Sequence, residues 1–268
     1  MPLVHSNRYL FLRQTKSPSF LAAITIKSTP TKSSALPHFC GSIKEIKTEL
    51  RDYPLTSTII KLKTGRVQLT IVKEPDWFLE QLSREDSEGR LYLPYWTYLW
   101  EAAIALARYV EDIGTDLKDA HILEIGCGFG LTGIVACQTG AKVIFTDVEQ
   151  DALHFAHHNA DQNSVIESAD FVQMDWNAPC FNSKFRYILG ADVIYEEHHW
   201  KPIVKLLQDY LTANGTALFS EPNRKNATGF FKLLNDNGFT YQKSTYPIKL
   251  DGRMNRVSIY TIRHISKK

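Results

Sequence analysis

Hydrophobic residues in the second half of the chain fall into short apolar runs separated by longer helical patterns. Each short run predicts a buried strand, because it is too short for a helix and is bounded by glycine or polar residues. Strands are expected at residues 121–125, 143–146, 169–174, 185–191, 216–220, 239–245 and 256–263. Helices are expected between them at residues 131–138, 149–163, 200–211 and 228–237. This alternation predicts a mostly parallel, Rossmann-like α/β sheet with helices on both faces.

The segment before this α/β pattern carries a hairpin signal. Residues 57–63 and 66–72 alternate between apolar and polar positions on the two sides of Gly65, which predicts two antiparallel strands. A short helix is expected at residues 75–82. A longer helix is expected up to residue 110, because apolar residues from position 99 onward recur on one face.

Four aromatic residues stand just before or at the start of this longer helix: Tyr95, Trp96, Tyr98 and Trp100. Two interpretations stay open. The aromatic side chains pack in the core, or they form one wall of a ligand site together with Glu101.

Charge separates the N-terminal segment from the rest. Residues 1–44 hold six of the 31 Lys and Arg residues and none of the 29 Asp and Glu residues, so the remainder has 25 basic against 29 acidic residues, a net charge of −4. Residues 1–42 are expected to be a basic, disordered extension, an organelle transit segment, or the product of an upstream start codon. Residues 43–92 are then a hairpin region packed on the core, and residues 93–268 form the main domain.

The same numbers bear on partners and location. Sequence-independent binding to nucleic acid needs a basic footprint, and the charge total of the main part shows none, so nucleic acid is not an expected partner. No apolar run reaches the roughly 18 residues of a membrane span, so no membrane partner is expected. We expect a cytoplasmic monomer, or a mitochondrial or plastid protein if the extension is a transit peptide.

Cysteine and histidine residues do not predict a metal site. The four cysteines are scattered without C-x-x-C spacing and are interpreted as reduced thiols. The H-x-x-H-H pattern of His154, His157 and His158 has no obvious carboxylate partner and is expected to lie on a solvated helix face. No metal is therefore expected.

The glycine-rich turn after residues 121–125 is the most informative stretch. Gly126, Gly128 and Gly130 follow the strand at once, and a turn of this kind needs positive φ angles and close backbone approach to a ligand. The next strand ends in Asp147, which is placed to hold the two hydroxyls of a ribose. The stretch predicts the first β-α-β unit of a nucleotide-binding sheet.

The glycines alone do not choose the nucleotide, since the segment from Gly128 to Gly133 also fits the dinucleotide pattern G-x-G-x-x-G. Acidic residues lie within or just after four of the strands: Glu124, Asp147, Asp175 and Asp192. These carboxylates would repel a pyrophosphate. S-adenosylmethionine has no phosphate and carries a sulfonium and an ammonium group, so the charge pattern favours it as the cofactor.

Three motifs together resemble a known family. The Glu124-x-Gly126-x-Gly128-x-Gly130 pattern resembles the first motif of the class I, seven-strand S-adenosylmethionine-dependent methyltransferases. Trp100-Glu-Ala-Ala and Asp192-Val-Ile-Tyr195 are similar to motifs of the small branch that methylates protein lysine side chains. The resemblance covers about residues 93–265 and implies a seven-strand sheet that closes with a reversed hairpin.

The resemblance implies a role for each motif residue in holding the cofactor. The backbone of Gly126 and Gly128, within the motif that ends at Gly130, would pass under the methionine moiety, with Glu124 near its amino end. Asp147 would accept hydrogen bonds from the ribose. The remaining contacts would be Asp175 to the adenine amino group, Trp176 against the adenine ring and Trp100 facing the cofactor.

The same resemblance implies that Asp192 and Tyr195 are the catalytic residues, which would orient a lysine amine and take up charge. Glu221-Pro-Asn-Arg224, at the end of a strand, is a candidate for substrate contact. The expected function is N-methylation of a lysine in a protein substrate. Two alternatives stay open: methylation of a small molecule or nucleic acid, and a non-catalytic binding module with the same fold. Val193 and Ile194 replace the prolines usual in amine-methylating nucleic-acid enzymes, which disfavours a nucleic-acid substrate.

Overall fold

The computed structural model describes residues 40–42, 50, 53–85, 94–224, 227–250 and 252–265. The predicted disorder of residues 1–42 concerns residues outside this part, apart from a short strand, β1 (Cys40–Ser42). The short helix expected at residues 75–82 is present as α1 (Pro75–Glu85) and continues three residues further than predicted.

Among the described residues, eight strands form the main sheet in the order β1-β6-β5-β4-β7-β8-β10-β9. Besides β1, they are β4 (His121–Ile125), β5 (Lys142–Asp147), β6 (Ala169–Met174), β7 (Phe185–Ala191), β8 (Leu211–Glu221), β9 (Phe239–Leu250) and β10 (Arg253–His264). The strands from β4 to β8 run parallel, whereas β10 is antiparallel to both β8 and β9. The predicted seven-strand sheet with a reversed closing hairpin is confirmed, and β1 adds an antiparallel strand at the β6 edge.

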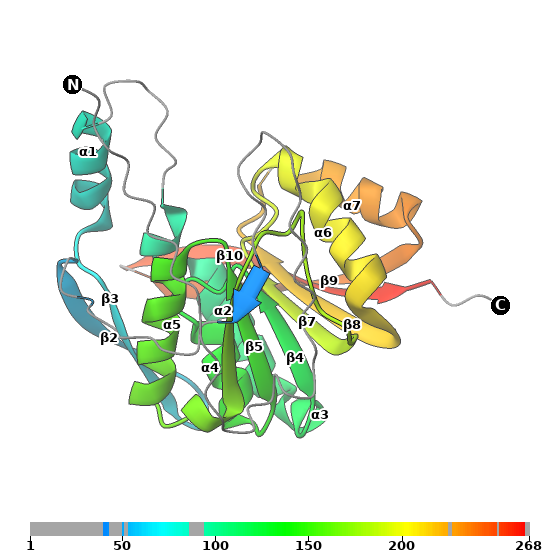
Figure 1. Cartoon of the computed structure of the whole chain (residues 1–268), viewed down its shortest axis with the longest axis horizontal. Coiled ribbons are helices and arrows are strands. Elements are labelled where there is room, and N and C mark those ends of the chain that lie inside the picture. Colours follow the sequence, from blue (N-terminus) through cyan, green and yellow to red (C-terminus); the bar gives the residue numbers. More distant parts are fainter. Residues whose placement is uncertain are drawn as a thin grey trace.

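Helices cover both faces of this sheet (Figure 1). One face is covered by α2 (Glu101–Asp112), α4 (Leu131–Gln138) and α5 (Gln150–Gln162), and the other by α6 (Glu197–Tyr210) and α7 (Ala227–Asp236). Successive residues of a strand point to opposite faces of the sheet: Ile122 packs on the face covered by α2, α4 and α5, and Leu123 packs on the face covered by α6 and α7. This explains why the strands appear in the sequence as continuous apolar runs. The remaining helical elements are α3 (Gly114–Leu117) and two short 3-10 turns, Tyr95–Thr97 and Ile166–Ser168.

Several elements begin earlier than predicted, and the shifts are largest for α6, β8 and β10. Helix α6 begins at Glu197 and not at Trp200, because its first turn is polar and gives no apolar periodicity. Strand β8 begins at Leu211 and not at Thr216, and β10 begins at Arg253 and not at Arg256. Phe185 of β7 pairs with Leu211 and Tyr187 pairs with Thr216, so a bulge in β8 takes up the extra residues.

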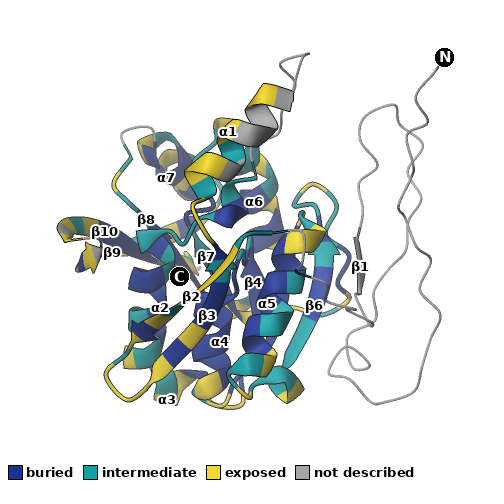
Figure 2. Ribbon diagram, turned by 90° about the vertical axis from the view of Figure 1, so that its left-hand side faces the viewer, coloured by how far each residue is buried: buried dark blue, intermediate teal, exposed yellow. Residues whose placement is uncertain are grey.

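The predicted hairpin forms a separate two-stranded sheet of β2 (Leu55–Lys61) and β3 (Arg66–Val72), which packs against α5 outside the main sheet (Figure 2). Side-chain amides of α5 bind the free edge of β3. Asn159 accepts from the N–H of Thr70 at 2.8 Å and donates to its carbonyl at 3.1 Å. One helical turn later, Asn163 binds the N–H and carbonyl of Gln68 in the same way, at 3.0 and 2.7 Å. The hairpin is therefore held by backbone hydrogen bonds as well as by apolar contact.

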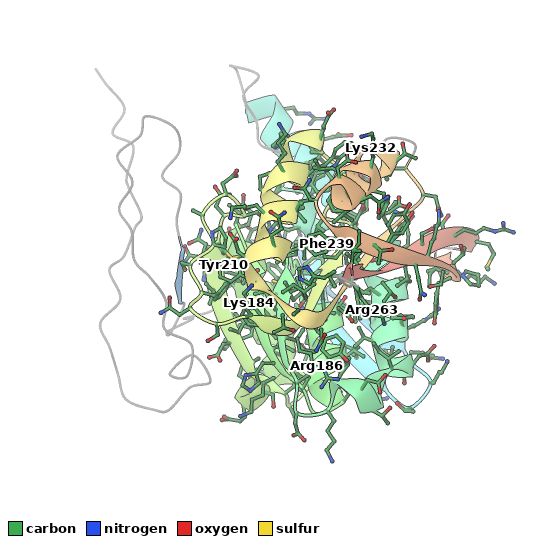
Figure 3. The ribbon with its side chains drawn as sticks, turned by 90° about the vertical axis from the view of Figure 1, so that its right-hand side faces the viewer. Lys184, Arg186, Tyr210, Lys232, Phe239 and Arg263 are labelled. Carbon is green, nitrogen blue, oxygen red and sulfur yellow. The ribbon has the colours of Figure 1, made fainter. Side chains whose placement is uncertain are left out.

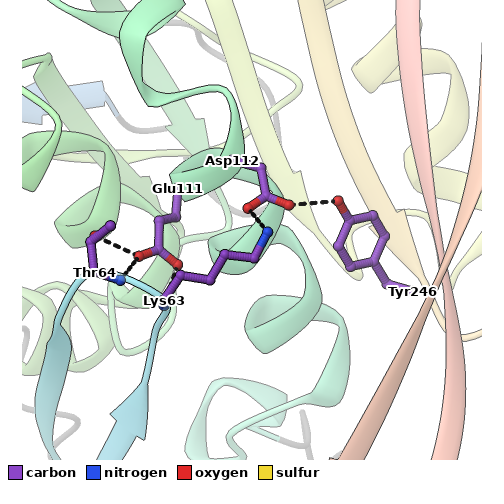
Figure 4. A network of polar contacts seen from close by, with 5 residues as sticks. All are labelled: Lys63, Thr64, Glu111, Asp112 and Tyr246. Carbon is purple, nitrogen blue, oxygen red and sulfur yellow. Dashed lines mark hydrogen bonds and ion pairs between the residues drawn. The ribbon is translucent and has the colours of Figure 1, made fainter.

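The turn of the hairpin is tied to the end of α2 (Figure 4). Glu111 accepts from the backbone N–H groups of Lys63 and Thr64 at 2.9 and 2.6 Å, and also from the Thr64 hydroxyl. Burial alone would raise the pKa of Glu111, but these hydrogen bonds outweigh it and the pKa is lowered. Asp112 pairs with Lys63 and accepts from the Tyr246 hydroxyl of β9 at 3.1 Å. One helix end thus joins the hairpin to the edge of the main sheet.

Helix α6, which follows the D-x-x-Y motif, is fixed at its far end (Figure 3). The Tyr210 hydroxyl donates to the carbonyl of Pro179 at 3.1 Å, and the Lys184 ammonium donates to the carbonyl of Gln208 at 3.4 Å. The last carbonyls of a helix have no partner within the helix, so a lysine there is favourable. These contacts hold the helix whose first turn borders the site described below.

The cysteine prediction is correct for two side chains and wrong for one. Cys127 and Cys137 are buried free thiols. Cys180 is disulfide-bonded, so the expectation of four reduced thiols is wrong there, and the side chain of Cys40 lies outside the described ones. Pairing is set by proximity in the fold, which sequence spacing does not reveal.

The described helices include none that is both long and apolar enough to cross a membrane.

Candidate active site

A cavity of about 610 Å³ opens at the carboxyl ends of the parallel strands. It lies between the glycine-rich turn, the ends of β5, β6 and β7, and the aromatic segment before α2. Nine of the ten site residues expected from the sequence line it: Trp100, Glu124, Gly126, Gly128, Asp147, Asp175, Trp176, Asp192 and Tyr195. Gly130 is not part of the lining and instead forms the N-cap of α4, packed against Ala156.

The glycine-rich turn has the backbone that its sequence predicts. Gly126, Gly128 and Gly130 have φ angles of 60°, 50° and 80°, which side-chain-bearing residues rarely adopt. A Cβ on Gly126 would lie 3.1 Å from the Val193 side chain and 3.2 Å from the Trp176 ring. The space above this backbone is therefore kept open by the absence of a side chain.

Asp147 closes the turn from the end of β5. One carboxylate oxygen accepts from the N–H of Gly128 at 3.0 Å and the other from the N–H of Glu149 at 3.0 Å. Burial raises the pKa of Asp147, and these hydrogen bonds partly offset the rise. Each oxygen retains a further lone pair for a ligand hydroxyl. Glu149 also lines the cavity, although the sequence indicated it only as a helix boundary.

The inner end of the cavity holds a buried carboxylate beside a hydroxyl without a partner. Glu124 is 2% exposed and accepts from the N–H of Gly133 at 3.1 Å. Burial raises its pKa to about 8. Thr132 directly precedes Gly133 in α4. Its hydroxyl is buried and has no hydrogen-bond partner among the described residues. Nothing in the sequence pattern marked Thr132, because the apolar helix around it reads as core.

The aromatic segment before α2 has both of the roles that the sequence left open: part of it packs in the core and part of it lines the cavity. Trp96 packs in a core cluster with Phe129 and Phe155. The rings of Tyr98 and Trp100 lie in tilted contact, with centroids 5.2 Å apart, and both residues line the cavity; the Trp100 indole donates to the Tyr95 carbonyl at 2.9 Å. Glu101 lines neither cavity, so its expected place in the wall is wrong, although its charge lies close enough to Asp192 to act on the pKa of that carboxyl.

A second cavity of about 410 Å³ adjoins the first. Four residues line both: Tyr95, Trp100, Asp192 and Tyr195. The two acidic residues that begin α6 or precede it, Glu196 and Glu197, line the second cavity only, as does Arg224. The Asp192-to-Tyr195 motif thus stands at the junction of the two cavities.

Asp192 has an unusual backbone at this junction. Its φ angle is 53°, in the left-handed region, and its N–H donates to the carbonyl of Ser220 at 2.8 Å. Aspartate and asparagine tolerate this conformation better than most residues, but it still stores strain, which in proteins concentrates at functional sites. The strain aims the carboxylate at the boundary between the cavities.

Arg224 holds that carboxylate in a two-point ion pair. Its Nε lies 3.2 Å from one oxygen of Asp192 and its Nη2 lies 2.5 Å from the other. Burial raises the pKa of Asp192, and the ion pair acts against the rise. The sequence predicted only that Glu221 to Arg224 might contact a substrate; it gave no signal that Arg224 pairs with Asp192.

The histidines do not gather around a metal site. Among the described residues, no group of three His, Cys, Asp or Glu side chains is placed to hold a metal ion. His154 contacts Asp151, whereas His158 contacts the Thr70 hydroxyl of the hairpin at 3.2 Å. All three are partly buried, so the prediction of a solvated face is only partly correct.

Comparison with known proteins gives consistent results. A family model described as lysine methyltransferase matches residues 96–237. Mouse protein N-lysine methyltransferase METTL21A is 31% identical over 159 residues, covering 57% of this chain and 72% of that protein. The histidine protein methyltransferase 1 homolog of Dictyostelium discoideum is 30% identical over 176 residues, 62% of this chain but only 52% of that protein.

The fold also matches solved structures. A crystal structure from Pyrococcus horikoshii, provisionally described as an RNA methyltransferase, aligns with a TM-score of 0.51 over 73% of this chain and 98% of that one. At 17% sequence identity, this likeness concerns the fold alone.

Proposed function

The chain belongs to the lysine methyltransferase family, whose model matches residues 96–237 of its 268, and on this premise we propose that it methylates lysine side chains of a protein substrate. The methyl donor of the family is S-adenosylmethionine. The observation that carries the proposal is the place of Asp192 and Tyr195 at the junction of two cavities. A transferase needs such a junction, because donor and acceptor must meet at one point from two sides.

The larger cavity fits S-adenosylmethionine. Its volume of about 610 Å³ lies in the range of small-molecule sites. Asp147 and Asp175 line it as carboxylates, and a bound cation would also favour the ionised form of the buried Glu124, so this acidic lining suits a cationic ligand. The Thr132 hydroxyl, which has no partner among the described residues, is available to hydrogen-bond a ligand.

Different residues of this cavity would hold the different parts of the cofactor. Glu124 and Thr132 hold the methionine end over the open backbone of Gly126. Asp147, with Glu149 beside it, takes the ribose hydroxyls. At the outer end, Asp175 accepts from the adenine amino group, while Trp176 lies against the ring.

When bound, S-adenosylmethionine supplies an electrophilic methyl carbon: the acceptor nitrogen lone pair forms the N–C bond, the S–C electron pair goes to sulfur, and neutral S-adenosylhomocysteine leaves. Tyr95, Trp100 and Tyr195 exclude water at the junction, and Asp192 accepts a hydrogen bond from the acceptor amine. A lysine amine must lose a proton before attack, which costs ~4.6 kcal/mol at pH 7 for a pKa of about 10.4. The aromatic walls lower this cost by desolvating the ammonium form.

The test is transfer of labelled methyl groups. Purified protein is incubated with tritium-labelled S-adenosylmethionine and a soluble protein extract, with parallel samples treated with protease or nuclease. Acid hydrolysis and amino-acid analysis then identify the product. Label in methyllysine supports the proposal. The proposal would be refuted if nuclease removed the labelled product and protease did not, if the label appeared in small molecules, or if no label were transferred.

A histidine acceptor is the second candidate, because the Dictyostelium relative is named as a histidine protein methyltransferase. The same hydrolysate separates the two candidates, since methylhistidine and methyllysine elute apart. The monomeric state, the cytoplasmic or organellar location and the domain limits at residues 42 and 92 stay predictions.

A further inference from the structure

We propose that Arg224 is a positioning residue that neutralises Asp192, so that the acceptor lysine is held at the cavity junction as a free amine and not as an ammonium ion. The inference rests on the proposed function and extends it to a residue that the family motifs do not include. It follows from the geometry of the ion pair and from the charges around it.

The ion pair uses both oxygens of Asp192, through Nε at 3.2 Å and Nη2 at 2.5 Å. A two-point contact of this kind fixes the carboxylate plane as well as its charge. The Asp192 side chain is 5% exposed, so water does little to screen the pair. Each oxygen keeps one lone pair, and Asp192 can still accept a hydrogen bond from an amine.

The loop that carries Arg224 is built to hold it. Glu221 is 1% exposed; it accepts from the backbone N–H of Arg224 at 2.7 Å and from the Tyr260 hydroxyl at 3.0 Å. Asn223 has a φ angle of 63°, donates to the Arg256 carbonyl at 2.6 Å and accepts from Ser258 at 2.5 Å. The loop that carries Arg224 is therefore tied to two strands of the main sheet, while the Arg224 side chain itself is 34% exposed.

Neutralisation matters because a carboxylate and an amine have conflicting needs here. A bare carboxylate beside a lysine stabilises the ammonium form, raising the lysine pKa by about 1–3 units. An ammonium ion has no lone pair and cannot attack the methyl carbon. A carboxylate already paired with a guanidinium can orient the amine by a hydrogen bond without favouring its protonation.

The surroundings make this neutralisation necessary. The imidazoles of His198 and His199 line the larger cavity beside Tyr195. Among the described residues, the other ionisable groups that face the pair are acids or phenols. The acids are Glu101 at the start of α2, Glu221 at the end of β8, and Glu196 and Glu197 at the start of α6. The phenols are Tyr195 of the D-x-x-Y segment, Tyr95 of the aromatic segment and Tyr260 of β10. Among the described residues that line the second cavity, Arg224 carries the one positive charge. Without Arg224, the acceptor amine would meet the carboxylates that line the second cavity with no guanidinium to balance their charge.

The first test is the pH profile of methyl transfer by wild type, Arg224→Gln and Arg224→Lys, from pH 6.5 to 10 on one soluble protein extract, with label counted as methyllysine. We expect the acid limb of Arg224→Gln to move up by about 1 unit, so that its rate falls roughly tenfold at pH 7 and recovers at high pH. Arg224→Lys keeps the charge, and its limb stays within a few tenths of a unit of wild type. Arg263→Gln, on β10 (Figure 3), leaves the profile unmoved, because the Arg263 guanidinium donates to the hydroxyl of Thr216, several residues before the Glu221 end of β8.

The second test needs no turnover. Calorimetry measures binding of n-butylammonium, which mimics the end of a lysine side chain, at pH 7. We expect Arg224→Gln to bind it about tenfold more tightly than wild type, because the bare carboxylate prefers the cation. The double variant Asp192→Asn with Arg224→Gln leaves no unpaired buried charge, and we expect it to lose this gain.

The outcomes separate the two proposals. If wild type labels no lysine, the proposed function fails. If wild type labels lysine but Arg224→Gln only loses rate evenly across the pH range, or binds n-butylammonium no better, this inference fails alone. Retained binding of S-adenosylhomocysteine shows that a variant is folded. If Arg224→Gln does not fold, Arg224→Lys still decides, since a shifted acid limb there would also refute the inference.

Discussion

Glu124 lies against the first turn of α4, where its carboxylate accepts a hydrogen bond from the backbone N–H of Gly133 at 3.1 Å. The approach is so close that a Cβ on Gly133 would stand 2.4 Å from the carboxylate oxygen. Glycine at position 133 is therefore required by this contact, and the contact fixes a buried acid at the inner end of the cofactor cavity.

The buried Glu124 predicts a pH-dependent stability. Its pKa is raised by burial from 4.5 to about 8, so between these values the folded state holds a proton that the unfolded state has lost. The free energy of unfolding must then fall as pH rises through this window, by up to about 1.4 kcal/mol per pH unit. We expect urea unfolding without cofactor to show wild type losing stability relative to Glu124→Gln from pH 5 to pH 8. A stability difference that does not change with pH would contradict this.

The Thr132 hydroxyl predicts an effect on cofactor binding without an effect on folding. Thr132→Val keeps the side-chain shape and removes a buried hydroxyl that has no protein partner. We expect the melting temperature without cofactor to be unchanged or higher, since no protein hydrogen bond is lost. Affinity for S-adenosylmethionine should fall by about 1–2 kcal/mol, roughly five- to thirtyfold, in a calorimetric titration. Equal affinity in the two proteins would show that the hydroxyl does not contact the cofactor.

We predict that Asp192→Asn keeps cofactor binding but loses most of the methyl-transfer activity. Asparagine tolerates the φ angle of 53° at this position, so the fold should be kept. We expect affinity for S-adenosylmethionine to stay within about threefold, while methyl transfer to protein falls by about 10²-fold or more, as is typical when an oriented polar contact to the reacting group is lost.

Asp209→Asn is the matched control for this prediction. Asp209 lies on the exposed side of α6 and pairs with Lys205. Removing its charge should leave both measurements unchanged. Joint loss of cofactor binding and turnover in Asp192→Asn would instead mean that Asp192 has a structural role.

The amides of α5 predict a large and a small loss of stability. Asn159 is fully buried and serves the N–H and carbonyl of Thr70 and the carbonyl of Phe129. Asn159→Ala leaves these groups without partners, and we expect it to cost about 3 kcal/mol or more of unfolding free energy. Asn163→Ala breaks a similar but solvent-exposed pair, for which about 1 kcal/mol is expected. Urea unfolding of both variants tests this, and equal losses would contradict it.

The order of the elements and the place of the cavity at the strand ends could be predicted because they follow from local rules. Apolar runs such as 121–125 mark buried strands, and the glycines at 126, 128 and 130 mark a backbone with positive φ angles. The carboxyl ends of parallel strands meet at one edge, so Glu124 and Asp192 were expected in the same site although 68 positions separate them.

The parts that escaped prediction are pairings between distant side chains. Arg224 and Asp192 stand 32 positions apart, and Asn159 and Thr70 stand 89 apart. Asp192 was marked by its motif and Arg224 only as a candidate for substrate contact, but nothing in the sequence indicated that the two side chains pair. Neither Asn159 nor Thr70 has a spacing that distinguishes it from a surface residue of the same type. Such contacts depend on how two elements dock, and this is determined by the whole core.

The binding of Asn159 and Asn163 along β3 has a consequence for how this protein behaves in a crowded solution. An uncovered strand edge is a template on which another chain can add a strand, and two-stranded sheets are especially exposed to this. Here the outward N–H and carbonyl groups of Gln68 and Thr70 are already engaged by amide side chains of the same molecule. A strand of another molecule therefore cannot pair with β3 at these two residues. Helix α5, which supports the cofactor site, thus also protects the hairpin from aggregation.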